Sequence, residues 1–256
     1  MQNSFVTDAI NLKSYNLSES DKIIVMYSKD KGLIRGVAKG VKKPKSKLGA
    51  RMDLLVANTL MLHKGKNLDT ICQAEVLNSF YKTRQDIDKI CYSTYVTEIV
   101  HNFGVEEDPC SAQVYDLLYK ALDAISKAEN KVEVMLAVIK FQLKMMTESG
   151  FSVELDDCLC CHSHIADETM YFVPAIGGVV CERCAGRVMH AKKQMAYKMR
   201  DFFKKMAEND FDYKGEYELK ANERVCEVTF EALKSYIEMK SPKKFKSADI
   251  IMQMPV

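Results

Sequence analysis

Hydrophobic and polar residues alternate in short runs along residues 1–80, which is the pattern of β-strands with one buried face. Val6, Ile10 and Leu12 share one face of a first run, and a second run extends from Ile23 to Tyr27. Further runs follow at residues 33–39, 52–56, 59–63 and 68–74, with a turn before the third run at residues 30–32. Five or so short strands in this length predict a small oligonucleotide-binding (OB) barrel, which binds strands across one face and its loops.

After about Arg84 the hydrophobic period becomes that of amphipathic α-helices. Helical patterns extend over residues 92–103, over 114–125 after a start signal at Asp108 and Pro109, and over 132–146, where Gly150 ends the pattern. Two more helices are predicted at residues 195–206 and 226–237. The prediction is an α+β protein, with a five-stranded OB-fold barrel at residues 1–80 and a helical domain at residues 81–256.

The composition is that of an ordinary globular protein, with 47% hydrophobic and 28% charged residues, and it excludes a disordered or collagen-like chain. The longest stretch without Asp, Glu, Lys or Arg has 13 residues, Thr169 to Cys181, so no membrane-spanning helix is predicted. The first residues lack the pattern of a signal peptide, and we expect a cytoplasmic protein. Its nine cysteines are then reduced thiols or metal ligands.

The charge is unevenly distributed along the chain. The total is only +2, but residues 1–80 carry 13 basic and 7 acidic side chains, a net +6, which leaves −4 for the remainder. Eight basic residues and no acidic one lie between Lys31 and Met52. A solvated surface loop is one explanation. The other is a surface that follows the phosphates of nucleic acid.

Cys158 and Cys161 form one C-x2-C knuckle, and Cys181 and Cys184 form a second. Two knuckles separated by a hairpin-length segment place four thiolates around a Zn²⁺ ion, so we predict one structural zinc in an insert at about residues 156–187. One of Cys160, His162 and His164 can replace a cysteine as a ligand, although the regular spacing favours Cys161. Four other cysteines lie on strand or helix patterns, and we predict that they are small buried hydrophobic residues: Cys72, Cys91, Cys110 and Cys226.

The sequence contains none of the motifs that mark common active sites. It has no Walker A phosphate loop, G-x-S-x-G elbow, H-E-x-x-H helix or Rossmann fingerprint. Its acidic pairs lie at element boundaries, where solvated loops or helix starts explain them. We therefore predict no enzymatic activity.

Taken in order, these features resemble the RecO family of bacterial DNA repair proteins, over nearly the whole chain. The resemblance rests on residues 8–13, 18–22, 31–40 with the basic loop that follows, 68–75, 95–98, Phe151 after Gly150, and the two knuckles around Phe172, Gly177 and Gly178. The segment 31–40 with its basic loop, followed at this distance by the paired cysteines, is the most specific part. One departure is the residue after the second cysteine of each knuckle, often Gly, which is His162 in one and Ala185 in the other.

The resemblance implies a recombination mediator that binds single- and double-stranded DNA and anneals complementary strands. With RecR it would help RecA replace single-strand-binding protein on gapped DNA, and its helical domain would dock the tail of that protein. The implied location is the cytoplasm, in association with the nucleoid. The resemblance implies DNA contact at Arg35, Lys39, Lys42, Lys43, Lys45, Lys47 and Arg51, and zinc ligation at Cys158, Cys161, Cys181 and Cys184. An alternative class is a zinc-ribbon adaptor whose basic loop binds RNA or a protein.

Overall fold

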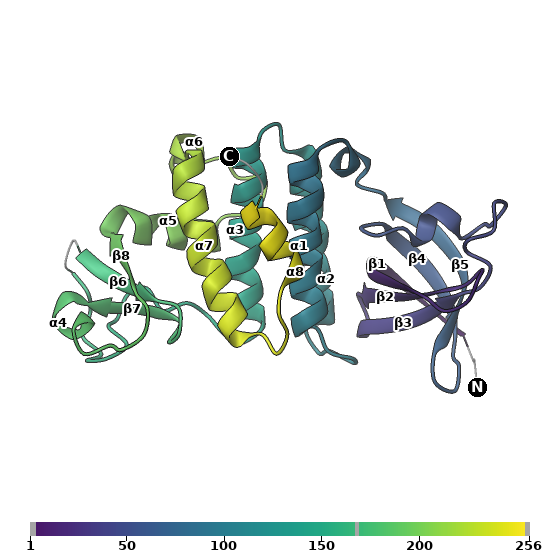
Figure 1. Ribbon diagram of the computed structural model, residues 1–256, viewed down its shortest axis with the longest axis horizontal. Helices are drawn as coiled ribbons and strands as arrows, with labels where there is room; N and C mark the ends of the chain where they lie inside the picture. The colour runs from purple at the N-terminus through teal and green to yellow at the C-terminus, as the bar shows by residue number, and fades with distance from the viewer. Residues whose placement is uncertain (1–3, 167–168, 254–256) are drawn as a thin grey trace. The chain divides into compact units, whose positions relative to one another are not determined.

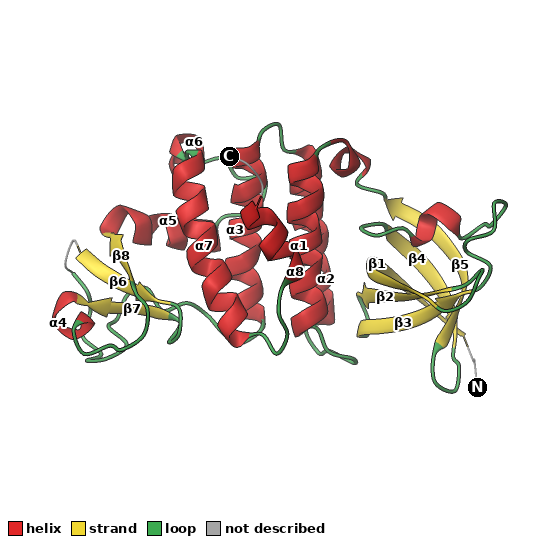
Figure 2. Cartoon of the chain, in the orientation of Figure 1, coloured by secondary structure: helices red, strands yellow, loops and turns green. Residues whose placement is uncertain are grey.

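A computed structural model describes residues 4–166 and 169–253 of the chain. It divides into two compact units, residues 1–127 and 128–256, and each is described by itself. Figure 1 follows the chain from its N-terminus to its C-terminus, and Figure 2 marks the helices and strands.

The first unit contains a closed five-stranded barrel with the strand order β1-β2-β3-β5-β4 (Figure 1). Its strands are β1 (Ser4–Asn16), β2 (Lys22–Ser28), β3 (Gly32–Ala38), β4 (Ala57–His63) and β5 (Asp69–Asn78). β3 and β5 pair in parallel, and the other neighbours are antiparallel. The barrel confirms the predicted OB fold.

Alternate residues of the strands fill the barrel interior, as a period of two requires. Ala9, Ile24 and Met26 belong to this core with Leu60 and Leu62. The remaining buried members of the core are Ala38, Val41, Met52 and Ile71. Strand β1 has a bulge between Asn11 and Lys13, where its register with β2 shifts.

Val6 and Ile10 share a face of β1, as predicted, but Val6 is 63% exposed, because the outer face of a barrel meets solvent wherever no helix covers it. One detail of the strand prediction is wrong. Residues 52–56 do not form a strand. Met52 ends a 3-10 helix, η1 (Gly49–Met52), and Leu55 has a φ of 67°, a left-handed conformation that an extended strand does not contain.

Two helices predicted from the sequence complete the first unit, α1 (Ile87–Phe103) and α2 (Ser111–Lys127), after a short 3-10 helix η2 (Tyr81–Gln85). The loop between α1 and α2 is bonded to the barrel. Tyr27 donates a hydrogen bond to Asp108 Oδ2 at 2.7 Å, and the Glu107 backbone N–H donates to the Lys31 carbonyl at 2.7 Å. Helix α2 also contacts β1, β2 and β3, so these helices pack against the barrel.

The second unit is a helical body with a small sheet. Its helices are α3 (Lys131–Glu148), α4 (Glu182–Ala185), α5 (Tyr197–Glu208), α6 (Glu216–Lys220), α7 (Glu223–Lys240) and α8 (Lys246–Gln253). Helix α3, predicted from the pattern at residues 132–146, is buried on nearly all sides and packs against α5 and α7. Among the described residues, no helix is both long and apolar enough to cross a membrane.

The small sheet has the order β7-β6-β8, from strands β6 (Thr169–Val173), β7 (Gly178–Cys181) and β8 (Lys193–Ala196). The hairpin of β6 and β7 was predicted. Met195 was predicted in a helix but lies in β8 opposite Met170, and helix α5 begins only at Tyr197. Met195 is buried, but it pairs in the sheet and is not part of the helical pattern that begins at Tyr197.

Candidate metal centre and nucleic-acid interface

Four cysteines from three segments meet at one end of the small sheet. Cys158 and Cys161 lie in the loop before β6, Cys181 ends β7, and Cys184 lies in α4. Their Sγ atoms all lie within 4.8 Å of one another. Four sulfurs at about 2.3 Å from a central zinc ion are about 3.8 Å apart, so the cluster is close to the size that a metal needs. The group can hold a metal ion.

Backbone hydrogen bonds hold the two knuckles in this position. The Leu159 N–H donates to the Val179 carbonyl at 3.0 Å, and the Cys181 N–H donates to Cys158 Sγ at 3.4 Å. Gly178 allows the first knuckle to lie this close to the hairpin, because a Cβ there would come within 2.5 Å of the Glu154 carbonyl. The hairpin thus fixes the positions of the thiols.

His162 adopts the backbone conformation expected of glycine at this point of a knuckle. Its φ is 56°, in the left-handed region, and its N–H donates to the Cys158 carbonyl at 2.8 Å. Its side chain is not part of the four-cysteine cluster, and neither is Cys160, which is exposed. The left-handed turn is therefore present with histidine in place of glycine.

The surroundings of the cluster lower the pKa of one cysteine thiol and raise that of another. Hydrogen bonds from the backbone N–H and hydroxyl of Ser163 lower the pKa of Cys161 to about 6. A hydrogen bond to Cys181, followed by burial, raises the pKa of Cys184 to about 12. Thiolate is the form that binds metal, so Cys161 is already favourable to a cation, whereas Cys184 would have to lose its proton when one binds.

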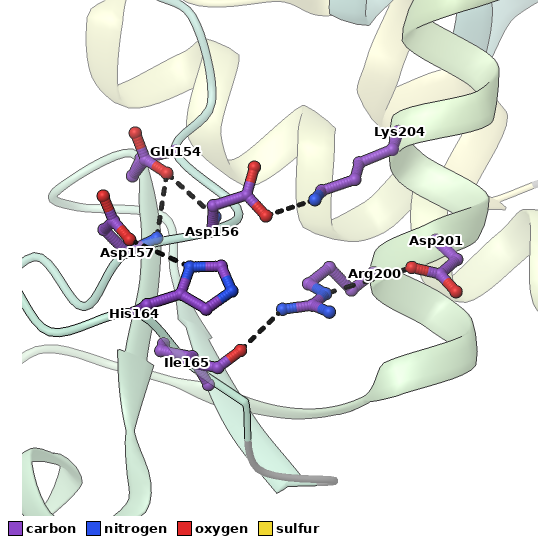
Figure 3. A network of polar contacts seen from close by, with 8 residues as sticks. All are labelled: Glu154, Asp156, Asp157, His164, Ile165, Arg200, Asp201 and Lys204. Carbon is purple, nitrogen blue, oxygen red and sulfur yellow. Dashed lines mark hydrogen bonds and ion pairs between the residues drawn. The ribbon is translucent and has the colours of Figure 1, made fainter.

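A polar network joins the first knuckle to helix α5 (Figure 3). Lys204 forms an ion pair with Asp156, which lowers the pKa of that carboxyl group, and Arg200 donates to the Ile165 carbonyl at 2.9 Å. Glu154 accepts hydrogen bonds from the backbone N–H groups of residues 156 and 157 at 2.8 and 3.1 Å. The network therefore anchors the loop that carries Cys158 to the helical body.

The remaining cysteines differ from the prediction that all four are buried. Cys226 is buried, and its burial raises its pKa to about 12. Cys91 and Cys110 are only partly buried. Cys72 is exposed, because its position in β5 faces away from the barrel core that Ile71 fills.

The seven basic residues predicted to contact DNA lie on the barrel and on the connection between β3 and β4. All seven are exposed, and none forms an ion pair with a carboxylate in the part of the chain that the structure describes. Lys31, at the start of the same run, instead pairs with Glu107 at 3.0 Å. The run therefore presents a dense set of cations to solvent, mostly on one connection.

The connection contains no long regular element, but its first part is anchored. The Gly40 N–H donates to Asp21 Oδ1 at 2.7 Å, and this bond is the main cause of the lowered pKa of Asp21. The Lys42 N–H donates to the Ser20 carbonyl at 3.1 Å. These contacts place the start of the basic segment beside the loop between β1 and β2.

An open cleft of about 520 Å³ lies at the other end of the basic segment. One of its lining residues is a basic side chain that the sequence analysis did not identify. Arg84 lines this cleft with Arg51, although the two are far apart in the sequence. Its guanidinium donates to the Ser79 carbonyl at 2.7 Å and to the Leu54 carbonyl at 2.9 Å. The other lining residues are Ser46, Ala50, Asp53, Val56, Val76 and Ser79.

Two family models match this chain in sequence. One, described as "Recombination protein O N terminal", matches residues 1–80, and the other, "Recombination protein O C terminal", matches residues 84–249. Among curated relatives, "DNA repair protein RecO" of Desulforamulus reducens is 30% identical over 95% of this chain and 92% of its own length. The protein of the same name from Rubrobacter xylanophilus is 34% identical over 68% of this chain and 69% of its own length.

A third relative, from Symbiobacterium thermophilum and also named "DNA repair protein RecO", is 27% identical over 95% of both chains. The matched regions include the OB barrel, the basic segment and the four-cysteine cluster. These sequence matches show that the chain belongs to the RecO family of DNA repair proteins.

Proposed function

We propose that this protein is a recombination mediator that binds single- and double-stranded DNA and anneals complementary strands. The observation that carries the proposal is the set of seven exposed basic side chains on and beside an OB barrel, none neutralised by a carboxylate among the described residues. Membership of a DNA repair family supports the same conclusion. No chemical step on DNA is proposed.

The physical basis of annealing is charge neutralisation. Two complementary strands repel each other through their phosphates, and Lys42, Lys43, Lys45 and Lys47 supply four cations within six residues. Binding these phosphates releases counterions, so the affinity falls steeply as salt rises. Several phosphate contacts predict a loss of about 10³-fold or more between about 50 and 200 mM salt.

The test is a strand-annealing assay with Lys42, Lys43, Lys45 and Lys47 all replaced by Ala. Annealing should be lost, and the salt dependence of DNA binding should become shallower by about one unit of slope for each lost contact. A matched control replaces the exposed lysines 192, 198, 243 and 244 of the second unit, which removes the same charge elsewhere. Equal loss in both variants, or none in the first, would contradict the proposal and favour the adaptor class.

We also propose that Cys158, Cys161, Cys181 and Cys184 bind one structural Zn²⁺ per chain. A site of four thiolates has no open position for water, so its role is to stabilise the small sheet and not to catalyse. Metal analysis should give about one zinc per chain and a clear loss in Cys181→Ser. His162→Gly should retain the zinc, and loss of metal in that variant would put the imidazole in the ligand set.

The proposed partners are RecR, the C-terminal tail of single-strand-binding protein, and RecA indirectly, as implied by the family resemblance. Their proposed joint activity is the loading of RecA onto gapped DNA covered by single-strand-binding protein. A pull-down with purified RecR and single-strand-binding protein tests the direct contacts. The absence of enzymatic activity is tested with labelled DNA and divalent metal, where intact DNA is the expected result.

A further inference from the structure

The basic segment from Lys31 to Arg51 contains no Phe, Tyr or Trp, so its sequence predicts little stacking on DNA bases. The fold brings an aromatic side chain to this region from another part of the chain. Tyr15 lies near the end of β1 and is 45% exposed. The loop that follows it, residues 17–21, is the one against which the basic segment is anchored.

Strand register places Tyr15 on the outer face of the barrel. Tyr15 is opposite Ile23, and Ile23 is opposite Val37 on β3. The residue next to Ile23, Ile24, points into the barrel core, and neighbouring residues on a strand point to opposite faces. The outer face therefore carries Tyr15, Ile23 and Val37 side by side.

Cations flank this row on the same face. Two residues further along each strand, and so on the same face, Lys13 is opposite Val25, and Val25 is opposite Arg35. The Lys13 Nζ lies 5.2 Å from the centre of the Tyr15 ring, and both Lys13 and Arg35 are exposed. Tyr15 thus lies among positive charges that can hold the phosphates on either side of a base.

The basic segment continues these charges beyond the loop. Lys42 donates from its Nζ to the Ser18 carbonyl at 2.9 Å, which places its ammonium group at residues 17–21. Two acidic residues lie in the same loop. Asp21 is committed to the Gly40 N–H and the Ser20 hydroxyl, whereas Glu19 is exposed. The exposed cations Lys13, Arg35 and Lys42 outnumber this one free carboxylate.

We propose that Tyr15 is a stacking position for an unpaired base of single-stranded DNA, with Lys13 and Arg35 on the adjoining phosphates. The proposal rests on the proposed DNA binding and adds a contact that distinguishes single strands from duplex. Bases inside a duplex are already stacked on each other, so the ring of Tyr15 is useful only to an unpaired strand.

The chain contains no tryptophan, which makes a direct optical test possible. Tyr15→Trp introduces a single indole at the proposed position, and its fluorescence should be quenched when an oligothymidine strand binds. Tyr213→Trp, at a residue of the second unit that is 53% exposed, is the control and should not respond. An unquenched indole at position 15 with DNA bound would overturn the proposal.

Affinity measurements give the second readout. Tyr15→Ala should weaken single-strand binding by about tenfold, by the same factor at low and high salt, because stacking releases no counterion. Duplex binding should stay unchanged, which also shows that the variant is folded, and Tyr15→Phe should behave as wild type. Equal losses on duplex and single strand would contradict the proposal. If the unaltered protein binds no DNA at all, the proposed function itself fails.

Discussion

At the scale of single residues, the clearest energetic feature is a buried ion pair in the second unit. Lys140 is 2% exposed, and its Nζ lies 2.9 Å from Glu218 Oε1. The same ammonium donates to the carbonyls of Asp210 and Tyr213 at 2.8 and 3.0 Å. The pair therefore fastens the segment between α5 and α6 to the central helix α3.

Glu218→Gln should destabilise this unit by roughly 3–5 kcal/mol, because it leaves the buried ammonium of Lys140 without a counter-charge. Urea unfolding near neutral pH measures the loss. The matched control is Glu216→Gln, which breaks the fully exposed pair between Glu216 and Lys220 and should leave the midpoint unchanged. Equal effects of the two substitutions would show that burial of the pair is irrelevant.

The same pair makes stability depend on pH. Burial opposes ionisation of Glu218, but hydrogen bonds from Lys140 and Asn209 outweigh it and lower the pKa of Glu218. A depressed pKa contributes stability above the ordinary value of about 4.3, and the contribution is lost as pH falls further, through the folded-state pKa. The unfolding free energy of the wild type should therefore fall more steeply than that of Glu218→Gln between about pH 5 and 3.

The sequence predicted some residue positions better than others. The four clustered cysteines were predictable because knuckle spacing is a local property of the chain. The positions of Tyr15 and Arg84 were not predictable. Strand register sets the neighbours of Tyr15, and the tertiary fold brings Arg84 beside Arg51, so residues adjacent in the sequence carry no signal of either. The left-handed conformation of His162 was also hidden, since glycine is the usual indicator of such a turn.

At the scale of elements, periodicity predicted the long helices and most strands because each buries one face or nearly all faces. It failed where burial comes from another source. Met195 lies in β8, which pairs with β6, and residues 52–56 are held by backbone and side-chain hydrogen bonds to Asn11. The Asn11 side chain donates to the carbonyls of Arg51 and Asp53, both at 2.8 Å, which holds this segment without a strand.

The loop between α1 and α2 gives a prediction at the same scale. Tyr27→Phe removes the donor to Asp108 and should cost about 1–3 kcal/mol, since a partly buried carboxylate oxygen loses its partner. Thermal or urea unfolding measures it, and Tyr15→Phe, at an exposed ring, is the control. Unchanged stability in Tyr27→Phe would mean that the loop is not held by this bond.

The dependence of the unfolding free energy on pH, measured at alkaline pH, tests the same contact. Burial, and then the hydrogen bond to Asp108, raises the pKa of Tyr27 above its ordinary value. A raised pKa contributes stability below the unfolded value of about 10, and the contribution is lost as pH rises above that value. Between about pH 9 and 11 the wild type should lose stability that Tyr27→Phe, which has no hydroxyl, does not lose.

At the scale of the whole molecule, the net charge of +2 is the sum of two unlike parts. Residues 1–80 carry +6 and the remainder −4. The sequence predicted this division and the barrel that carries the positive part. It did not predict that α1 and α2 group with the barrel, because the bonds that join them link residues about 80 positions apart, such as Tyr27 and Asp108.

The extent of the unit that carries the proposed DNA contacts is therefore open to a direct test. The domain boundary predicted near residue 80 stays a prediction, whereas the compact unit extends to Lys127. In a fragment of residues 1–80, buried Tyr27 would lose Asp108, and the faces of β1, β2 and β3 that contact α2 would meet water. Exposed apolar area costs about 25 cal/mol per Å², so residues 1–127 should unfold at higher urea than residues 1–80.

The two fragments also separate stability from binding. All seven proposed DNA contacts and Tyr15 lie within residues 1–80, so both fragments should bind single-stranded DNA where both are folded. Unfolding curves and anisotropy titrations of the two fragments, each compared with the full chain, measure the two properties independently. If residues 1–80 unfold at the same urea concentration as residues 1–127, the helices add nothing to the barrel and the boundary lies near residue 80. If the shorter fragment is unfolded or markedly weaker, α1 and α2 are structural parts of the DNA-binding unit.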